Sequence, residues 1–194
     1  MDRLGILGGT FNPIHVAHLS IAEQVGEARG LEKVLFIPAR IPPHKGSPDI
    51  APAEDRYRMT VLATESNPRF EVSRIELDRS GTSFTKDTLQ ELREMYPGTE
   101  LYYIIGSDAV AELPTWREPD LVVKLARLLV VKRPGFDLTP FAERFGENVE
   151  TVDVSESDVS STEIRERTRR GLSIEQLVPP NVEQYIRKNG LYKV

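Results

Sequence analysis

Short, almost unbroken runs of apolar residues recur along the chain, at residues 4–7, 34–37, 101–105 and 128–131. They lack the polar alternation of a strand with one wet face, so they predict strands buried on both faces, as in a parallel sheet. Residues 70–75 and 149–152 have weaker strand patterns.

Helical periodicity fills the intervals between these runs, over residues 16–29, 54–65 and 84–96. In the first interval Leu19, Ala22 and Val25 share one face, and Gly30 is a typical stop. The alternation of strands and helices predicts an α/β fold: a Rossmann-like, doubly wound, mainly parallel sheet with helices on both faces. Residues 160–194 predict a short helical segment of two helices at the C-terminal end.

Composition limits the class of protein. The 194 residues suit one domain spanning 1–194, and the net charge of −5 disfavours a general nucleic-acid coat, which usually carries basic excess. The sequence holds no cysteine, which excludes disulfides, thiolate catalysis and zinc–thiolate sites. It shows neither a transmembrane-length apolar run nor a signal-peptide pattern, so we expect a cytoplasmic location.

The turn after the first strand concentrates the candidate chemistry, reading Gly8-Gly9-Thr10-Phe11-Asn12-Pro13-Ile14-His15-Val16-Ala17-His18. Open α/β sheets bind ligands at the carboxyl ends of strands, and a helix N-terminus favours anions. His15 and His18, two of the three histidines, would share one helix face. We interpret the turn as a phosphate site, the alternative being a tight turn with surface histidines. It matches neither a Walker A sequence nor G-x-G-x-x-G.

A proline-rich segment over residues 38–53 predicts a long loop, which in a compact domain is usually functional or mobile. This segment contains His44 and Lys45 directly after a rigid pair of prolines. Lys45 could bind phosphate, and an exposed basic loop tip explains the pattern about equally well.

Residues 160–165, Ser-Ser-Thr-Glu-Ile-Arg, predict a helix start with Ser160 or Ser161 as the N-cap. The hydroxyls, the free N–H groups and Arg165 could together bind a second anion. A well-capped helix with a solvated arginine-rich face explains the same residues, and local pattern slightly favours it.

Two further candidates follow the strand at 101–105. Asp108, behind Gly106, could accept hydrogen bonds from ribose hydroxyls or simply cap the next helix. Trp116, the single tryptophan, could stack on a flat ligand, although packing at a domain edge is the commoner fate of such a ring.

Together these motifs resemble the nucleotidyltransferase superfamily of the α/β phosphodiesterase type, through residues 8–13 with His15-x-x-His18 and through Ser161-Thr162-x-Ile164-Arg165. The resemblance narrows to one branch, the bacterial nicotinate-mononucleotide adenylyltransferases, and runs in order from residue 4 to 192. The segments that narrow it are 42–45, 82–89, 105–108, 114–116, 133–135 and 185–192.

The resemblance implies that ATP and nicotinate mononucleotide react to give deamido-NAD and pyrophosphate in NAD biosynthesis, with Mg²⁺. Because the sequence shows no convincing cluster of metal-binding carboxylates, we expect phosphates to hold this ion, with few protein ligands. The resemblance also implies His15 and His18 as catalytic contacts to the ATP phosphates. The implied ATP-binding residues are Gly8, Gly9, Thr10, Phe11, Gly106, Asp108, Ser160, Ser161, Thr162 and Arg165. The implied mononucleotide-binding residues are His44, Lys45, Thr85, Trp116, Arg117 and Arg133.

Two positions depart from the pattern of this family. Ala17 stands where the pattern has glycine, and the small alanine should be tolerated unless the backbone there needs a positive φ. Arg117 stands where an aromatic residue is frequent, which matters only if recognition uses the side chain rather than the backbone N–H.

The sequence alone leaves other functions open. One is an adenylyltransferase for another phosphate, such as nicotinamide mononucleotide or phosphopantetheine, and another is a non-catalytic nucleotide-binding regulatory module. A fragment of an aminoacyl-tRNA synthetase is disfavoured, because no Lys-Met-Ser-Lys-Ser-like stretch is present. We expect small-molecule partners, no nucleic acid and no membrane; whether the chain forms a homo-oligomer is left open.

Overall fold

The computed structural model describes residues 2–42, 49–132, 139–155 and 157–193. Six strands form one sheet in the order β3-β2-β1-β4-β5-β6, and every neighbouring pair is parallel. The strands are β1 (Arg3–Gly9), β2 (Lys33–Pro38), β3 (Phe70–Val72), β4 (Glu100–Gly106), β5 (Arg127–Val131) and β6 (Val149–Val152). The predicted doubly wound parallel sheet is confirmed, and β3 is shorter than its pattern suggested.

Apolar side chains of the central strands alternate between two cores. In β2, Val34 and Phe36 belong to one core, whereas Leu35 and Ile37 belong to the other. The residues of β4 and β5 divide in the same way. Because successive side chains of a strand point to opposite faces, a sheet covered on both sides needs apolar residues at consecutive positions, which is the pattern that predicted these strands.

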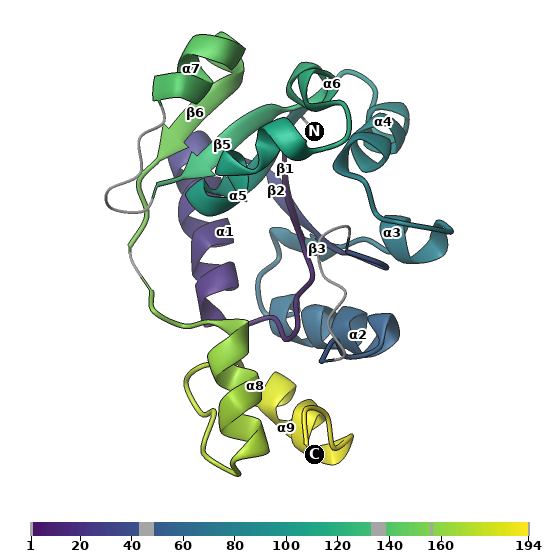
Figure 1. The fold of residues 1–194 in the computed structure, drawn as a ribbon, viewed down its shortest axis with the longest axis vertical. Helices are drawn as coiled ribbons and strands as arrows, with labels where there is room; N and C mark the ends of the chain where they lie inside the picture. Colours follow the sequence, from purple (N-terminus) through teal and green to yellow (C-terminus); the bar gives the residue numbers. More distant parts are fainter. Residues whose placement is uncertain (1, 43–48, 133–138, 156, 194) are drawn as a thin grey trace.

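Helices cover both faces (Figure 1), and the three predicted in the sequence are confirmed. The longer ones over one core are α1 (Val16–Arg29) and α2 (Ala53–Thr64), and those over the other are α4 (Thr85–Met95) and α6 (Pro119–Leu125). Gly30 ends α1 with φ of 60°. Shorter elements that the sequence did not predict are α3 (Ile75–Asp78), α5 (Ser107–Ala111), the 3-10 helix η1 (Leu113–Thr115), α7 (Thr139–Phe145) and the 3-10 helix η2 (Gly146–Asn148).

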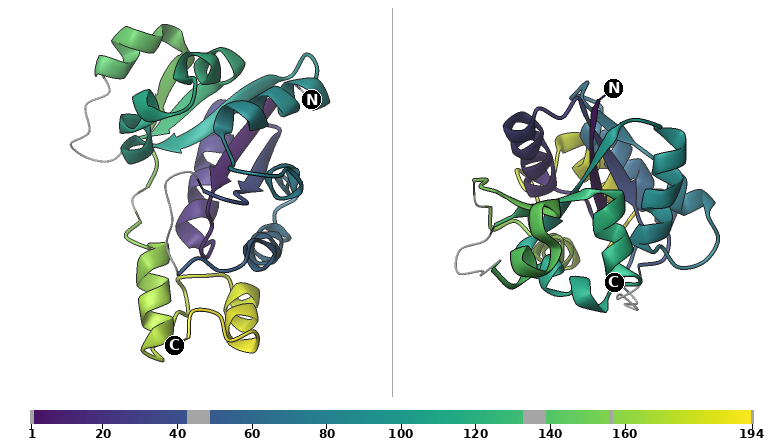
Figure 2. Two further views of the ribbon diagram at one scale, coloured as in Figure 1. Left: turned by 45° about the vertical axis from the view of Figure 1, so that its right-hand side comes forward. Right: turned by 90° about the horizontal axis from the view of Figure 1, so that it is seen from above.

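The last two helices lie beyond the carboxyl ends of the strands, as Figures 1 and 2 both show. They are α8 (Ser161–Arg169) and α9 (Pro180–Lys188), the pair predicted for the tail. Asn181 of α9 donates to the carbonyl of Leu62 in α2 at 2.6 Å. The sheet order makes β1 and β4 neighbours at the point where the winding reverses, which is where open α/β sheets bind ligands.

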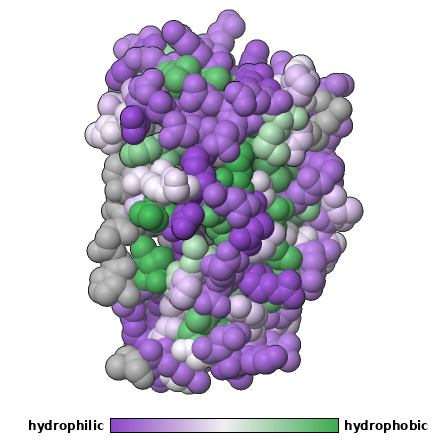
Figure 3. All heavy atoms as spheres, turned by 90° about the vertical axis from the view of Figure 1, so that its right-hand side faces the viewer, coloured by the Kyte–Doolittle hydropathy of each residue, from purple (hydrophilic) through white to green (hydrophobic). Residues whose placement is uncertain are grey.

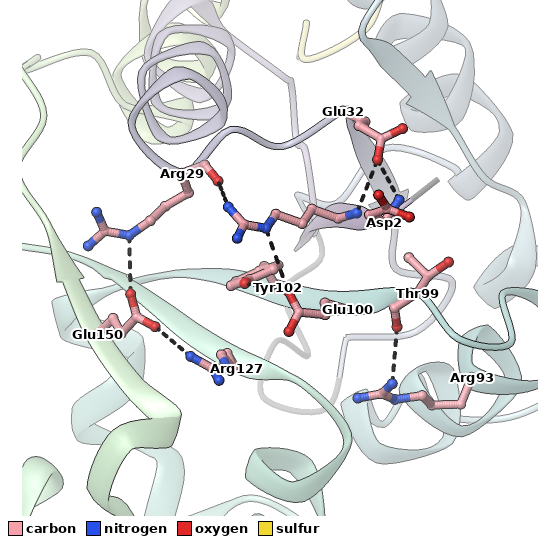
Figure 4. A network of polar contacts seen from close by, with 10 residues as sticks. Asp2, Arg29, Glu32, Arg93, Thr99, Glu100, Tyr102, Arg127 and Glu150 are labelled. Atoms are coloured by element: carbon pink, nitrogen blue, oxygen red, sulfur yellow. Dashed lines mark hydrogen bonds and ion pairs between the residues drawn. The ribbon is translucent and has the colours of Figure 1, made fainter.

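Ion pairs cross the opposite, amino-terminal end of the sheet (Figure 4). Arg3 of β1 pairs with Glu100 of β4 at 3.5 Å, and Arg127 of β5 pairs with Glu150 of β6 at 3.2 Å. Arg29 at the end of α1 also reaches Glu150, at 3.2 Å. Basic and acidic residues therefore join neighbouring strands at the end of the sheet that lies away from α8 and α9.

On the face drawn in Figure 3, hydrophilic residues cover most of the surface, and hydrophobic residues show only in small separate patches. The large hydrophobic side chains exposed in the described parts are Ile41, Met95 and Leu172. Within those parts, no helix combines the length and the apolar character needed to cross a bilayer.

Candidate active site

A cavity of about 830 Å³ opens at the carboxyl ends of β1 and β5, between the start of α1 and the start of α8. Its volume suits a small-molecule ligand. The structure brings together here the following residues singled out in the sequence: Gly9, Thr10, Phe11, His15, His18, Ser160, Ser161, Thr162 and Arg165.

The two histidines lie side by side at the N-terminal end of α1. His15 is the N-cap residue and His18 belongs to the first turn, with their ring centroids 3.8 Å apart. The backbone N–H of His15 donates to Nδ1 of His18 at 3.3 Å, which leaves Nε2 to carry the proton of a neutral His18. Burial lowers the pKa of His15 to about 4, so His15 is neutral at pH 7 and offers one N–H donor rather than a positive charge.

The glycine pair serves the protein's own packing. A Cβ on Gly8 would lie 2.7 Å from the hydroxyl of Tyr103, and one on Gly9 would lie 3.0 Å from the ring of Phe11. Phe11 has φ of 47°, a left-handed conformation unusual for a bulky residue, and its ring meets His18 edge-on at 5.2 Å. The turn is thus shaped around two aromatic rings, and close approach of a ligand to these glycines stays a prediction.

Helix α8 is joined to this turn although more than a hundred residues separate them. Ser161 Oγ donates to the carbonyl of Pro13 at 2.8 Å, and Arg165 Nη1 donates to the carbonyl of Asn12 at 3.0 Å. Ser160 is the N-cap, accepting from the N–H of Glu163 at 3.2 Å. Arg165 Nε is buried without a hydrogen-bond partner among the described residues. Arg165 is therefore held in the cavity wall rather than on a solvated helix face.

Asn12 ties further segments to the same turn, a role that sequence reasoning missed. Its Nδ2 donates to the carbonyl of Asp49 at 2.9 Å, and its Oδ1 accepts from the N–H of Ala51 at 3.0 Å and from the hydroxyl of Tyr192 at 3.0 Å. The sequence motif contained Asn12, but its partners are mostly backbone groups of a distant loop.

A second cavity, of about 360 Å³, lies on the other side of the first turn. Gly9 and Thr10 line both cavities. Two molecules bound in the two cavities would therefore meet at these residues. The lining of the smaller cavity comprises Gly8, Gly9, Thr10, Ala39, Pro42, Glu76, Ser83, Phe84, Thr85, Tyr103, Ala109, Glu112, Thr115, Trp116 and Arg117.

Aromatic rings form one wall of this smaller cavity. Trp116 is half-buried and meets Tyr103 edge-on at 6.2 Å. The guanidinium of Arg117 lies 4.9 Å from the centroid of the Phe84 ring, a cation–π contact. Burial and the nearby charge of Glu76 raise the pKa of Tyr103 to about 12, so its hydroxyl stays protonated. Trp116 thus combines packing with an accessible edge in the cavity.

The carboxylates near the smaller cavity have different surroundings. Lys86 pairs with Glu118 at 2.6 Å and with Asp87 at 3.4 Å. Glu76, which sequence reasoning missed, lines the cavity, and burial raises the pKa of its carboxyl group. The hydroxyl of Thr88 donates to Glu76 at 2.7 Å.

Several predicted site residues lie elsewhere. Gly106 is the last residue of β4 and Asp108 lies in α5. Both are exposed and line neither cavity, and a Cβ on Gly106 would meet no atom within 4 Å. His44, Lys45 and Arg133 fall outside the described residues. Ala17 is buried within α1, where the backbone is helical, so alanine fits without a positive φ.

A magnesium ion carried by phosphates fits the residues of the larger cavity. Across the described ranges, no three His, Asp or Glu side chains gather to hold a metal. The cavity offers Asp158 and neighbouring serine hydroxyls, such as Ser157, as oxygen donors. Mg²⁺ commonly keeps several waters and binds through one or two carboxylates together with substrate phosphates.

Comparisons with known proteins agree with this geometry. The family model described as cytidylyltransferase-like matches residues 6–167. The chain is 46% identical over 192 residues to a probable nicotinate-nucleotide adenylyltransferase of Saccharopolyspora erythraea, covering 98% of this chain and 90% of that one. It is 47% identical over 191 residues to a protein of the same description from Thermus thermophilus, covering 98% and 100%.

The chain belongs to the nicotinate-nucleotide adenylyltransferase family. The resemblance inferred from the motifs is confirmed. A solved structure of the Plasmodium falciparum nicotinic acid mononucleotide adenylyltransferase complexed with NaAD has the same fold, with a TM-score of 0.81 at 18% identity over 99% of this chain and 98% of that one. Within this nicotinate-nucleotide adenylyltransferase fold, the two cavities lie at the carboxyl ends of the strands.

Proposed function

We propose that this protein transfers the adenylyl group of ATP to nicotinate mononucleotide, giving nicotinate adenine dinucleotide and pyrophosphate. The observation that carries the proposal is the pair of cavities that meet at Gly9 and Thr10, with His15 and His18 side by side in the wall of the larger one. ATP fits the larger cavity, and the mononucleotide fits the smaller one. The curated relatives that span the whole chain carry the corresponding name.

The reaction joins two anions and needs no nucleophile from the protein. A phosphate oxygen of the mononucleotide forms a bond to the α-phosphorus of ATP, and the bond from that phosphorus to the bridging oxygen of the β-phosphate breaks. Pyrophosphate leaves with that electron pair. Phosphoryl-type transfer of this kind depends on positioning and on charge stabilisation.

We assign both the positioning and the charge stabilisation to residues of the larger cavity. His18 and the neutral His15 line this cavity and would donate N–H groups to the α-phosphate. Arg165, Thr162 and Ser161 come from the start of α8, whose N-terminal N–H groups favour the phosphates that leave. Mg²⁺ bound to the phosphates would neutralise part of their charge, with Asp158 as the nearby carboxylate.

The smaller cavity suits a flat, anionic ring. Trp116 offers an aromatic surface beside Tyr103, and Thr85 begins α4, so backbone N–H groups are available for a carboxylate. Arg117 adds a positive charge to the lining of this cavity. These features favour the acid mononucleotide over its amide. The proposed roles of His44, Lys45, Arg133, Gly106 and Asp108 stay predictions, as do a cytoplasmic location and self-association.

An acceptor panel tests the proposal. Purified protein is mixed with ATP, Mg²⁺ and either nicotinate mononucleotide, nicotinamide mononucleotide or phosphopantetheine, and pyrophosphate release is followed. We expect the highest kcat/KM with nicotinate mononucleotide. A higher value with another acceptor would reassign the substrate. ATP binding without pyrophosphate release from any acceptor would indicate a regulatory module instead.

A further inference from the structure

Arg56 of α2 is a deeply buried cation that the sequence did not single out. Its side chain is 1% exposed, and its three donor nitrogens all bind backbone carbonyls. Nε donates to Ala51 at 3.0 Å, Nη1 to Thr10 at 2.7 Å and Nη2 to Arg40 at 3.2 Å. Among the described residues, the ion pairs include no carboxylate partner for Arg56.

A guanidinium buried without a counter-ion is unfavourable, because desolvation of the charge is not offset by an opposite charge. The desolvation lowers the pKa of Arg56. The same three carbonyls could be satisfied by water or by backbone N–H groups, so stability alone does not explain a charged group here. An arginine contributes instead a rigid, planar fork that fixes the relative positions of its acceptors.

The three acceptors belong to segments that line the two cavities. Thr10 lines both of them. Arg40 follows Ala39, which lines the smaller cavity, and Ala51 follows Ile50, which lines the larger one. One side chain therefore holds a wall segment of each cavity against the turn they share.

Neighbouring backbone hydrogen bonds join the same segments. The N–H of Ala39 donates to the carbonyl of Gly9 at 2.9 Å, and the N–H of Ala51 donates to Asn12 Oδ1 at 3.0 Å. Arg56 binds one residue of each segment that these bonds join, namely Thr10, Arg40 and Ala51.

We propose that Arg56 is a positioning residue that fixes the turn at residues 10–13 against the loop segments 39–42 and 49–52, and thereby aligns the two substrates for in-line attack. The inference rests on the proposed function of the two cavities. Reacting atoms must approach to about 3–3.5 Å, and a misplacement of about 1 Å lowers the rate roughly 10²-fold. Loss of the fork should therefore lower kcat more than it weakens the binding of either substrate alone.

The test compares Arg56→Met with Arg93→Met. Arg93 is the control because its guanidinium also binds two backbone carbonyls, those of Leu125 at 2.7 Å and Thr99 at 3.1 Å, but it is exposed and lies away from both cavities. Figure 4 shows its bond to Thr99. Both variants are assayed at a temperature at which circular dichroism shows them folded. The measurements are kcat, the KM of each substrate and the Kd of ATP alone.

We expect Arg56→Met to lower kcat about 10²-fold while the Kd of ATP changes less than about threefold, and Arg93→Met to leave both near the wild-type values. A kcat for Arg56→Met within about threefold of wild type overturns the inference. So does a parallel change of kcat and Kd, which would indicate a general loss of structure.

Hydrogen exchange tests, without measuring turnover, whether Arg56 fixes the turn against the two loop segments. We expect the amides of Ala39 and Ala51 to exchange faster in Arg56→Met than in Arg93→Met, because both lie at the junction that Arg56 holds. Unchanged exchange at these amides would contradict the positioning role. Failure of the wild-type protein to release pyrophosphate would count against the proposed function. The hydrogen-exchange comparison would still test whether Arg56 holds the three segments together.

Discussion

The neutral His15 makes the stability of the fold depend on pH. Burial lowers its pKa from 6.5 to about 4, so the unfolded chain takes up this proton before the folded protein does. The stabilisation is therefore complete above about pH 6.5 and is lost as the pH falls towards 4. From these two pKa values, linkage gives a loss of about 2 kcal/mol between pH 7.5 and pH 5 from His15 alone, and of about 3 kcal/mol at still lower pH.

Urea unfolding at pH 7.5 and pH 5 measures this dependence, with circular dichroism as the probe. Carboxylates also titrate in this range, so the matched protein is His15→Gln, which keeps a polar side chain that does not titrate. We expect the wild-type free energy of unfolding to fall by about 2 kcal/mol more than that of His15→Gln. Equal losses in the two proteins would show that His15 is solvated in the folded state and would refute the argument.

Three further predictions concern catalysis and packing. His18→Ala should lower kcat about 10²–10³-fold by removing a preorganised donor, and near-normal turnover would exclude a catalytic role. Arg165→Ala should raise the KM of ATP more than that of the mononucleotide, because Arg165 lines only the larger cavity; equal increases would contradict the assignment. Gly8→Ala should lower the melting temperature, because its Cβ would lie 2.7 Å from the hydroxyl of Tyr103, and Tyr103→Phe should restore part of the loss. Unchanged melting of Gly8→Ala would indicate that Tyr103 moves freely.

The central strands were predictable because a sheet covered on both faces leaves unbroken apolar runs, as in β2 and β5. The long helices were predictable from their periodicity. The short ones were not: α5 buries Ser107 and Val110, and α6 buries Val122 and Val123. Two buried positions are too few to define a helical period, and such elements depend on tertiary packing.

The candidate site was predictable where function places unusual residues close together in the chain, as at His15 and His18. The remaining parts depend on partners that a sequence does not reveal. Arg56 is surrounded by charged residues on α2 and has the pattern of a solvated helix face, but it binds backbone carbonyls. Glu76 is buried and accepts a hydrogen bond from Thr88, which in turn accepts one from Arg79. In both cases burial follows from the tertiary fold and not from local polarity.

The contacts of Asn12 have a consequence for the order of folding. They connect it to Ala51, to Arg165 and to Tyr192, the last across 180 residues of chain. Closing such long loops is entropically unfavourable until most of the chain is ordered. We therefore expect a refolding chain to regain its helical signal before it regains ATP binding, because the cavity becomes complete only when distant parts of the described chain meet at one residue, Asn12.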